Sequence, residues 1–254
     1  MKNAQMIILA GGMGTRMKSD NPKSLTPLAG KPFLKHITDM ADSLELSFPP
    51  VIVVGYKREQ VMKALGSGFI YAEQSEQLGT GHAVASAKDR VDPKSSAVLV
   101  LSSDQPLVSK ETVENLLKEH FAKKPAVTIA TMAVPDFEEW RKGLRHFGRI
   151  VRGPDGEVEG IVEFKDATEK EKMIKELNPA LYVFDPKWLW QNIGLLKNDN
   201  AKKEYYLTDM IKIAREQGKK IATAPLQSLI EGCQPNTTEE VTDLEKLLAK
   251  TKTQ

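Results

Sequence analysis

The sequence is poor in cysteine and has no long apolar run. Its single cysteine, Cys233, can form neither an internal disulfide nor a thiolate metal cluster, which excludes disulfide-stapled folds and cysteine-rich zinc proteins. The apolar runs at 6–10 and 98–101 are far shorter than the ~18 residues that cross a bilayer, and the first leads into Gly11 and Gly12, where a signal peptide would continue. We therefore expect a cytoplasmic protein that does not contact membranes.

Charge of one sign is not in excess either. The 36 Lys and Arg residues against 34 Asp and Glu residues leave a formal net charge of +2, without the basic excess of a protein that binds a nucleic-acid backbone. Internal repeats, low-complexity tracts and Pro/Gly/Ser-rich linkers are also missing. With 254 residues, of which 41% are hydrophobic, the chain can bury a sizeable core. We expect one domain over residues 1–254 and no nucleic-acid partner.

Apolar runs alternate with amphipathic stretches in the first half, which is typical of βαβ units on a mainly parallel sheet. The expected strands are 7–10, 51–54, 69–72 and 97–101, and the expected helices lie at 33–44, 61–65, 82–87 and 110–122. The second half predicts a strand at 127–134, a hairpin of 150–152 and 158–162, a helix over 205–217, and a C-terminal helix that begins at the capping-box spacing of 237–240.

Three glycines and a basic residue directly follow the first expected strand, in the segment Leu9-Ala10-Gly11-Gly12-Met13-Gly14-Thr15-Arg16-Met17. Ligands bind at the carboxyl ends of such strands, and glycines let backbone N–H groups converge on an anion, so we expect a phosphate site. Lys23 adds a second cation. The Walker pattern and the third glycine of the dinucleotide fingerprint are both missing, because Met17 stands at the latter position. A glycine-rich turn with solvated cations is the alternative for this loop alone.

Seven segments match one family in order and approximate spacing. They are 9–17 with Pro22-Lys23, 72–83, 103–107, 147–150, 161–167, 176–178 and 204–209. Together they resemble the sugar-nucleotide pyrophosphorylases, and most closely the uridyltransferase domain of the bacterial N-acetylglucosamine-1-phosphate uridyltransferases. The resemblance implies an α/β, Rossmann-like nucleotidyltransferase fold of GT-A-like type, with a mainly parallel mixed sheet. A nucleotide-binding part would span about 1–125, a smaller β-rich sugar-binding part about 126–230, and a C-terminal helix about 237–250.

The resemblance also implies a role for individual residues. Glutamine side chains offer donors and acceptors for a uracil edge, and a carboxylate after a buried strand suits Mg²⁺, the implied cofactor. The implied nucleotide-binding residues are Leu9, Ala10, Gly11, Gly12, Gly14, Thr15, Gln74, Gln77, Gly79 and Thr80; the catalytic residues are Arg16 and Lys23, both expected on an exposed loop; the sugar-binding residues are Gly148, Glu163 and Asn178; and the metal ligands are Asp104 and Asn236.

Three places depart from the family pattern. Asn178-Pro179-Ala180 stands where the family commonly has Asn-Thr-Gly or Asn-Ser-Gly, so a backbone donor is lost at Pro179. Ser102-Ser103 replaces a Tyr-Gly pair. Gly232-Cys233-Gln234-Pro235-Asn236 stands where Gly-Val-Asn is typical, which makes Gln234 the competitor of Asn236 as second metal ligand.

The implied reaction is the Mg²⁺-dependent transfer of UMP from UTP to N-acetylglucosamine 1-phosphate, which gives UDP-N-acetylglucosamine and pyrophosphate. The alternatives are another sugar 1-phosphate such as glucose 1-phosphate, another nucleotide, or a catalytically silent sugar-nucleotide sensor. Hexapeptide repeats are missing from the sequence, so we expect no left-handed β-helix acetyltransferase domain. The expected partners are small-molecule substrates.

Overall fold

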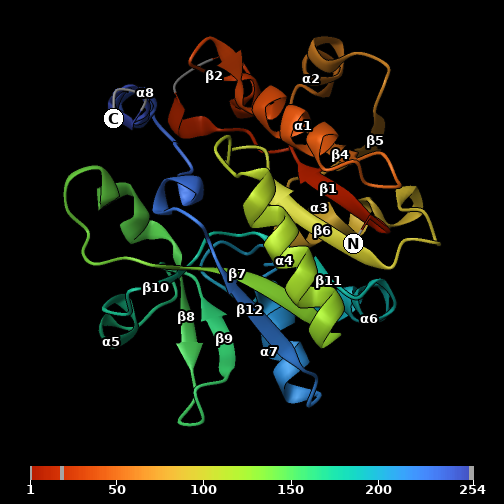
Figure 1. Cartoon of the computed structure of the whole chain (residues 1–254), viewed down its shortest axis with the longest axis vertical. Helices are drawn as coiled ribbons and strands as arrows, with labels where there is room; N and C mark the ends of the chain where they lie inside the picture. The colour runs from red at the N-terminus through yellow and green to blue at the C-terminus, as the bar shows by residue number, and fades with distance from the viewer. Residues whose placement is uncertain (1, 18–19, 252–254) are drawn as a thin grey trace.

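The fold is built on one mixed β-sheet. The computed structural model describes residues 2–17 and 20–251, and within them ten strands form a sheet in the order β5-β4-β1-β6-β11-β7-β10-β8-β9, with β12 paired to β7 (Figure 1). The strands are β1 (Ala4–Leu9), β4 (Val51–Val54), β5 (Ile70–Glu73), β6 (Ala97–Ser102), β7 (Val127–Ala133), β8 (Gly148–Arg152), β9 (Val158–Val162), β10 (Glu176–Asn178), β11 (Tyr182–Phe184) and β12 (Ile221–Pro225). A separate ribbon pairs β2 (Pro27–Leu28) with β3 (Lys31–Pro32). The expected α/β class is confirmed.

Four parallel strands determine where the site lies. β1 pairs with β4 on one side and with β6 on the other, so Ile7 lies opposite both Val51 and Val100. The chain moves outward from β1 to β4 and β5, and then returns to place β6 on the free side of β1. In open α/β sheets, ligands bind at the carboxyl ends of the strands where the strand order reverses in this way. The loops after β1 and β6 lie at that position.

The rest of the sheet is mainly antiparallel. β11 runs antiparallel between β6 and β7, and Val183 lies opposite Leu99 on one side and Thr128 on the other. β10 and β8 extend the sheet, and the predicted hairpin is confirmed as β8 paired with β9. The sequence pattern did not predict β11, because a three-residue strand carries almost no periodicity.

Helices cover both faces of the sheet, because its central strands are apolar on both sides. In β1, Ile7 faces one core while Met6 and Ile8 face the other, and all three are fully buried. Residues of α1 (Phe33–Ser43), α2 (Arg58–Leu65) and α4 (Lys110–Lys123) belong to the Met6 core. Residues of α3 (Thr80–Ser86), α6 (Pro186–Asn192) and α7 (Asp209–Glu216) belong to the Ile7 core. The sheet is therefore the middle of three layers.

One predicted helix begins later than expected. The helix predicted over 205–217 begins only at Asp209, because the Tyr205 N–H donates to the Leu78 carbonyl (2.8 Å) and the Leu207 N–H to Thr80 Oγ1 (3.0 Å). These bonds join the segment before α7 to Leu78 in the loop before α3 and to Thr80, the first residue of α3. A short α5 (Glu169–Lys172) follows β9.

The C-terminal helix α8 (Thr238–Thr251) starts where the capping-box spacing predicts. The Glu240 N–H donates to Thr237 Oγ1 (3.1 Å), and the Glu240 carboxylate accepts from the N–H of Asn236 (2.6 Å). The carboxylate thus reaches one residue further back than in the usual capping box, and it fixes the backbone of Asn236. No helix within residues 2–17 and 20–251 is both long enough and apolar enough to span a membrane.

Candidate active site

The loop after β1 packs closely against two other parts of the chain. Gly14 has a left-handed backbone (φ +62°), and a Cβ at this position would lie 2.5 Å from Cβ of Lys23. A Cβ at Gly11 would lie 2.9 Å from Oε1 of Gln74. A Cβ at Gly14 would collide with Lys23, and a Cβ at Gly11 would require the end of the Gln74 side chain to move. The two glycines therefore let the loop lie close to Lys23 and to Gln74. The side chain of the predicted residue Thr15 lies outside the described part of the chain.

The other predicted residues of this loop are Leu9, Ala10 and Gly12, and they differ in their exposure to solvent. Leu9 is the last residue of β1, and Ala10 is buried, with its N–H donating to the Val53 carbonyl (2.8 Å). Gly12 is exposed and has open space where a Cβ would be. The backbone at Gly12 is therefore accessible to a ligand.

Four predicted residues from distant parts of the sequence meet beside this loop. Lys23 forms an ion pair with Asp104 and donates from Nζ to Oδ1 of Asn236 (2.6 Å). Arg16 donates from Nη2 to the same Asn236 oxygen (2.8 Å). Arg16 lies in the 3₁₀ turn Thr15–Met17, Lys23 opens the 3₁₀ turn Lys23–Leu25, Asp104 follows β6 and Asn236 precedes α8. The cluster lies where Arg16 follows β1 and Asp104 follows β6, which is the edge of the sheet at which the strand order predicts a ligand site.

The Lys23–Asp104 pair is largely withdrawn from solvent. The side chains of Lys23 and Asp104 are 12% and 17% exposed, whereas Arg16 is exposed. The expectation that both basic residues lie on an exposed loop is therefore wrong for Lys23, because Asp104 draws its ammonium group inward. Burial on its own raises the pKa of Asp104, but the charge and hydrogen bond of Lys23, together with hydrogen bonds from Ser102 and the backbone, outweigh it, and the net pKa is lowered. Asp104 is held ionised.

The oxygens of this cluster suit a hard divalent cation. Oδ1 of Asp104 is buried and has no hydrogen-bond partner among the described residues, and Oδ1 of Asn236 binds the same ammonium group as the Asp104 carboxylate. Carboxylate and amide oxygens are ligands that Mg²⁺ accepts, and this ion usually keeps several waters or phosphate oxygens as well. Within the part of the chain that the structure describes, no group of three or more His, Cys, Asp or Glu could hold a metal ion. Asp104 and Asn236 fit a cation whose shell is completed by substrate and water.

The predicted base-recognition residues surround the turn between β5 and α3. Gln74 is buried, and its amide donates to the Gly79 carbonyl (3.0 Å) and lies 3.2 Å from Nδ1 of His82. Gln77 is exposed. Gly79 has φ +106°, and a Cβ there would lie 2.7 Å from the Tyr205 carbonyl. Gln74 therefore supports the turn through its bond to Gly79, while Gln77 presents an exposed polar side chain.

The three predicted sugar-binding residues come together on the antiparallel part of the sheet. Asn178 ends β10 opposite Gly148, the first residue of β8. A Cβ at Gly148 would lie 3.5 Å from Oε1 of Glu163, which also accepts from Oγ1 of Thr208 (3.4 Å). Burial raises the pKa of Glu163. Asn178 is buried; its Nδ2 donates to the Tyr182 hydroxyl (2.7 Å) and its Oδ1 accepts from the Ala180 N–H (3.0 Å).

Two glutamines hold the turn after Asn178, and sequence reasoning assigned this role to neither. Gln105 is fully buried; its amide donates to the Pro179 carbonyl, and its Oε1 accepts from the Ser102 N–H (3.0 Å). Gln234 donates to the same Pro179 carbonyl (2.9 Å). The sequence placed Gln105 in the Asp104 motif but held no signal for its partner, because the two residues lie 74 positions apart.

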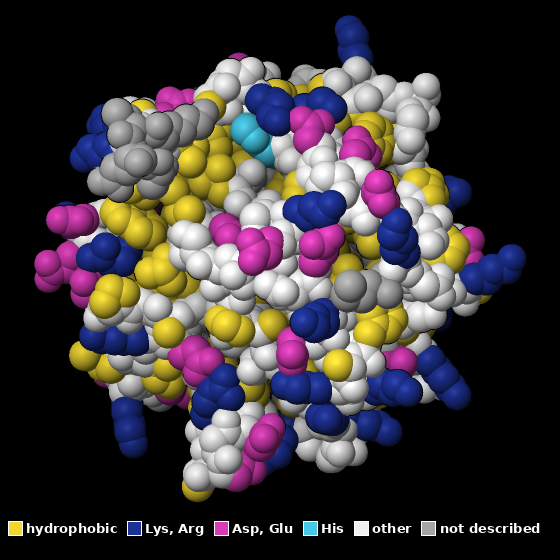
Figure 2. Space-filling model, viewed as in Figure 1, with side chains coloured by type: hydrophobic (Ala, Val, Ile, Leu, Met, Phe, Trp, Pro, Cys, Tyr) yellow, Lys and Arg dark blue, Asp and Glu magenta, His cyan; other side chains and the backbone are white. Residues whose placement is uncertain are grey.

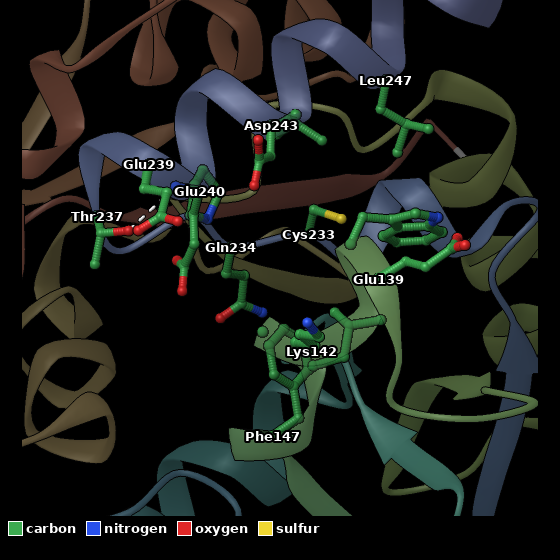
Figure 3. A pocket seen from close by; sticks show the side chains of 15 residues that line it. Glu139, Lys142, Phe147, Cys233, Gln234, Thr237, Glu239, Glu240, Asp243 and Leu247 are labelled. Carbon is green, nitrogen blue, oxygen red and sulfur yellow. Dashed lines mark hydrogen bonds between the residues drawn. The ribbon is translucent and has the colours of Figure 1, made fainter.

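A cavity of about 330 Å³ lies beside the cluster, between the 3₁₀ segment Glu139–His146 and α8. Apolar side chains gather beside α8 in the space-filling view (Figure 2). In Figure 3, Gln234 lies between Glu240 in the first turn of α8 and the pair Lys142 and Phe147. Gln234, Pro235 and Thr237 line this cavity, whereas the Asn236 side chain between them accepts from Lys23 and Arg16.

Comparison with known proteins identifies the family. The model of the MobA-like NTP transferase domain matches residues 6–182. The chain belongs to this family. It is a nucleotidyltransferase, and the enzyme class and the resemblance to sugar-nucleotide pyrophosphorylases expected from the sequence are confirmed.

Relatives of this nucleotidyltransferase are bifunctional GlmU proteins. The bifunctional protein GlmU of Exiguobacterium sibiricum is 44% identical over 216 residues, which cover 85% of this chain and 46% of the relative. That of Listeria innocua is 38% identical over 250 residues, which cover 98% of this chain and 53% of the relative. The chain spans about half the length of these relatives.

A solved structure with this fold is the 4-diphosphocytidyl-2C-methyl-D-erythritol synthase of Anaerococcus prevotii. It superposes with a TM-score of 0.65 over 97% of this chain and 98% of the other, at 17% sequence identity. At this identity the likeness concerns the fold alone, and the Rossmann-like nucleotidyltransferase fold is confirmed.

Proposed function

We propose that the protein transfers UMP from UTP to N-acetylglucosamine 1-phosphate with the help of Mg²⁺, and releases pyrophosphate. The observation that carries this proposal is the convergence of Arg16, Lys23, Asp104 and Asn236 at the carboxyl ends of β1 and β6. The choice of uridine nucleotide and sugar rests on the seven sequence segments that resemble N-acetylglucosamine-1-phosphate uridyltransferases.

Nucleotidyl transfer of this kind depends on charge neutralisation and not on proton transfer. A phosphate oxygen of the sugar 1-phosphate is already ionised at neutral pH, so its attack on the α-phosphorus of the nucleotide needs no general base. Arg16, which is exposed and adjoins the glycine loop, is placed to hold the departing pyrophosphate. Lys23 is placed to offset charge at the α-phosphate. Asp104 and Asn236 would hold Mg²⁺, which would supply further charge neutralisation at the phosphates.

Asn236 is the better second ligand for that ion. Its Oδ1 and the Asp104 carboxylate share one cation, the Lys23 ammonium group, so they face a common point. The amide of Gln234 is instead directed to the Pro179 carbonyl. We therefore expect Asn236→Ala to raise the Mg²⁺ concentration for half-maximal rate, and Gln234→Met to leave it unchanged.

The choice of base would depend on Gln74 and Gln77, and the choice of sugar on Glu163 and Asn178. Gln77 is exposed and free to pair with a base edge, while Gln74 supports the turn that presents Gly79. The Asn178 side chain already uses its oxygen and one N–H in hydrogen bonds to Ala180 and Tyr182. Glu163 is therefore the better placed side chain for sugar hydroxyls. Reshaping at Pro179 keeps glucose 1-phosphate and other sugar 1-phosphates as alternatives.

The decisive experiment is a pyrophosphate-release screen that crosses four nucleoside triphosphates with several sugar 1-phosphates. We expect UTP to exceed every other triphosphate at least tenfold in kcat/KM, with N-acetylglucosamine 1-phosphate as the best acceptor. A different preferred triphosphate would overturn the base assignment. Binding of UDP-sugar by calorimetry without any pyrophosphate release would identify a sensor instead.

A further inference from the structure

The Pro179 carbonyl is held by side chains from two different parts of the chain. Gln105 reaches it from the loop that carries Asp104, and Gln234 reaches it from the segment that carries Asn236. Pro179 is itself buried, and a buried carbonyl without partners costs free energy. The turn after β10 is thus bonded to both segments that carry the proposed metal ligands, the loop with Asp104 and the segment with Asn236.

This turn needs support from outside because its own backbone is strained. Ala180 has φ +59°, a left-handed conformation that L-residues with a side chain rarely adopt and that glycine adopts freely. The Ala180 N–H donates to Oδ1 of Asn178, so the strained residue also sets the orientation of that side chain. A change at the turn would therefore reach Asn178, which lies beside Gly148.

Gln234 connects the turn to Asn236 through its backbone as well. The Asn236 amide donates to the Gln234 carbonyl (2.7 Å), while Oδ1 of Asn236 faces Lys23. Gln234 thus contacts the Asn178–Ala180 turn with its side chain and Asn236, the proposed metal ligand, with its main chain. Asn236 has a second, independent support in the Glu240 carboxylate, whereas described contacts of the Pro179 carbonyl come from the two glutamines alone.

We propose that Gln234 is a positioning residue for the sugar 1-phosphate, and that it holds the Asn178–Ala180 turn at a fixed position relative to Asn236, the proposed metal ligand. The turn and the segment before α8 form a matched pair: the turn offers the Pro179 carbonyl, and the segment offers the Gln234 amide that binds it. This inference rests on the proposed function. Its consequence is that Gln234 governs affinity for the sugar phosphate and not for the nucleotide or the metal.

The test is Gln234→Met, which keeps the length of the side chain and removes its donor. Loss of one such hydrogen bond should raise KM for the sugar 1-phosphate about two- to tenfold. KM for UTP and the Mg²⁺ requirement should stay within twofold of the parent protein. The control is Gln227→Met, the same chemical change at an exposed residue, which should leave every parameter unchanged.

Hydrogen–deuterium exchange of the peptide that contains the turn is the second readout. The Ala180 amide should exchange faster in Gln234→Met than in the parent protein and in Gln227→Met. Unchanged exchange, or an unchanged KM for the sugar 1-phosphate, overturns the inference. A rise in the Mg²⁺ requirement also overturns it, because Gln234 would then act on the metal. If the parent protein releases no pyrophosphate with any substrate pair, the proposed function fails, and exchange alone decides whether Gln234 holds the turn.

Discussion

Removal of the Lys23 ammonium group should destabilise the protein strongly, although Lys23 lies in a loop. Lys23→Met leaves the Asp104 carboxylate with its largest compensating charge removed, in a place where only 17% of the side chain is exposed. Breaking a buried ion pair by removing one partner typically costs about 3–5 kcal/mol. The alternative is to protonate Asp104 at pH 7, which costs about 4 kcal/mol for a carboxyl with an ordinary pKa near 3.9. Protonation therefore does not make the loss of stability smaller.

The measurement is the free energy of unfolding in urea at pH 7, with EDTA present so that no divalent ion replaces the lysine. At roughly 2–4 °C per kcal/mol for a chain of this size, a loss of about 3–5 kcal/mol should lower the melting temperature by about 6–20 °C. Arg16→Met is the matched control. Arg16 is exposed and contacts the same Asn236 oxygen, so its loss should cost less than about 1 kcal/mol.

A double variant separates charge from packing. Lys23→Met with Asp104→Asn removes both charges, and it should be more stable than Lys23→Met alone because no uncompensated carboxylate is left. If Lys23→Met cost no more than Arg16→Met, or if the double variant lost the sum of both single losses, the ion pair would not be the stabilising element that the structure indicates.

Three further predictions follow from particular backbone and side-chain positions. Gly14→Ala should lower kcat at least tenfold because its Cβ would displace Lys23, whereas Gly30→Ala, which has φ +80° but open space around it, should lower stability alone; pyrophosphate release and melting curves distinguish the two. Ala180→Gly should raise the free energy of urea unfolding by about 1 kcal/mol by relieving its left-handed backbone, and a loss of stability would contradict the assigned strain. Burial lowers the pKa of His120 to about 4, so between about pH 6.5 and pH 4 the unfolded chain binds a proton that the folded chain does not. The free energy of unfolding should therefore decrease as the pH is lowered through that window, by up to about 3 kcal/mol. His120→Gln should reduce the difference in unfolding free energy between pH 7 and pH 4.5, and an equal difference in the variant and the parent protein would refute the assignment.

The parallel part of the fold was predictable because its signals are local. The strand predicted at 51–54 is found with the same bounds, since a continuous apolar run between polar segments is typical of a strand buried on both faces. The start of α8 was equally visible in the spacing from Thr237 to Glu240. The start of α7 was not, because the bond from Tyr205 to Leu78 joins residues more than a hundred positions apart.

The candidate site was predictable as a list of residues but not as an arrangement. Motif spacing placed Lys23 and Asp104 among the candidates, yet the loss of solvent around Lys23 depends on a contact 81 residues away. The choice between Asn236 and Gln234 depends on side-chain direction, which neighbouring residues in a sequence do not specify. Gln105 was overlooked for the same reason, because its partner Pro179 lies on another strand connection.

The insertion of β11 between β6 and β7 has a consequence for how the chain folds as it is synthesised. β6 ends at Ser102, and the strand that covers its open edge begins at Tyr182, roughly 80 residues later. Until that strand emerges from the ribosome, an apolar strand has unpaired backbone groups along one side, which is a template for pairing with other chains. A fragment that stops near residue 125 would keep this edge permanently uncovered. We therefore expect such a fragment to aggregate, and a fragment that extends past Phe184 to be the shortest one in which β6 is paired on both sides.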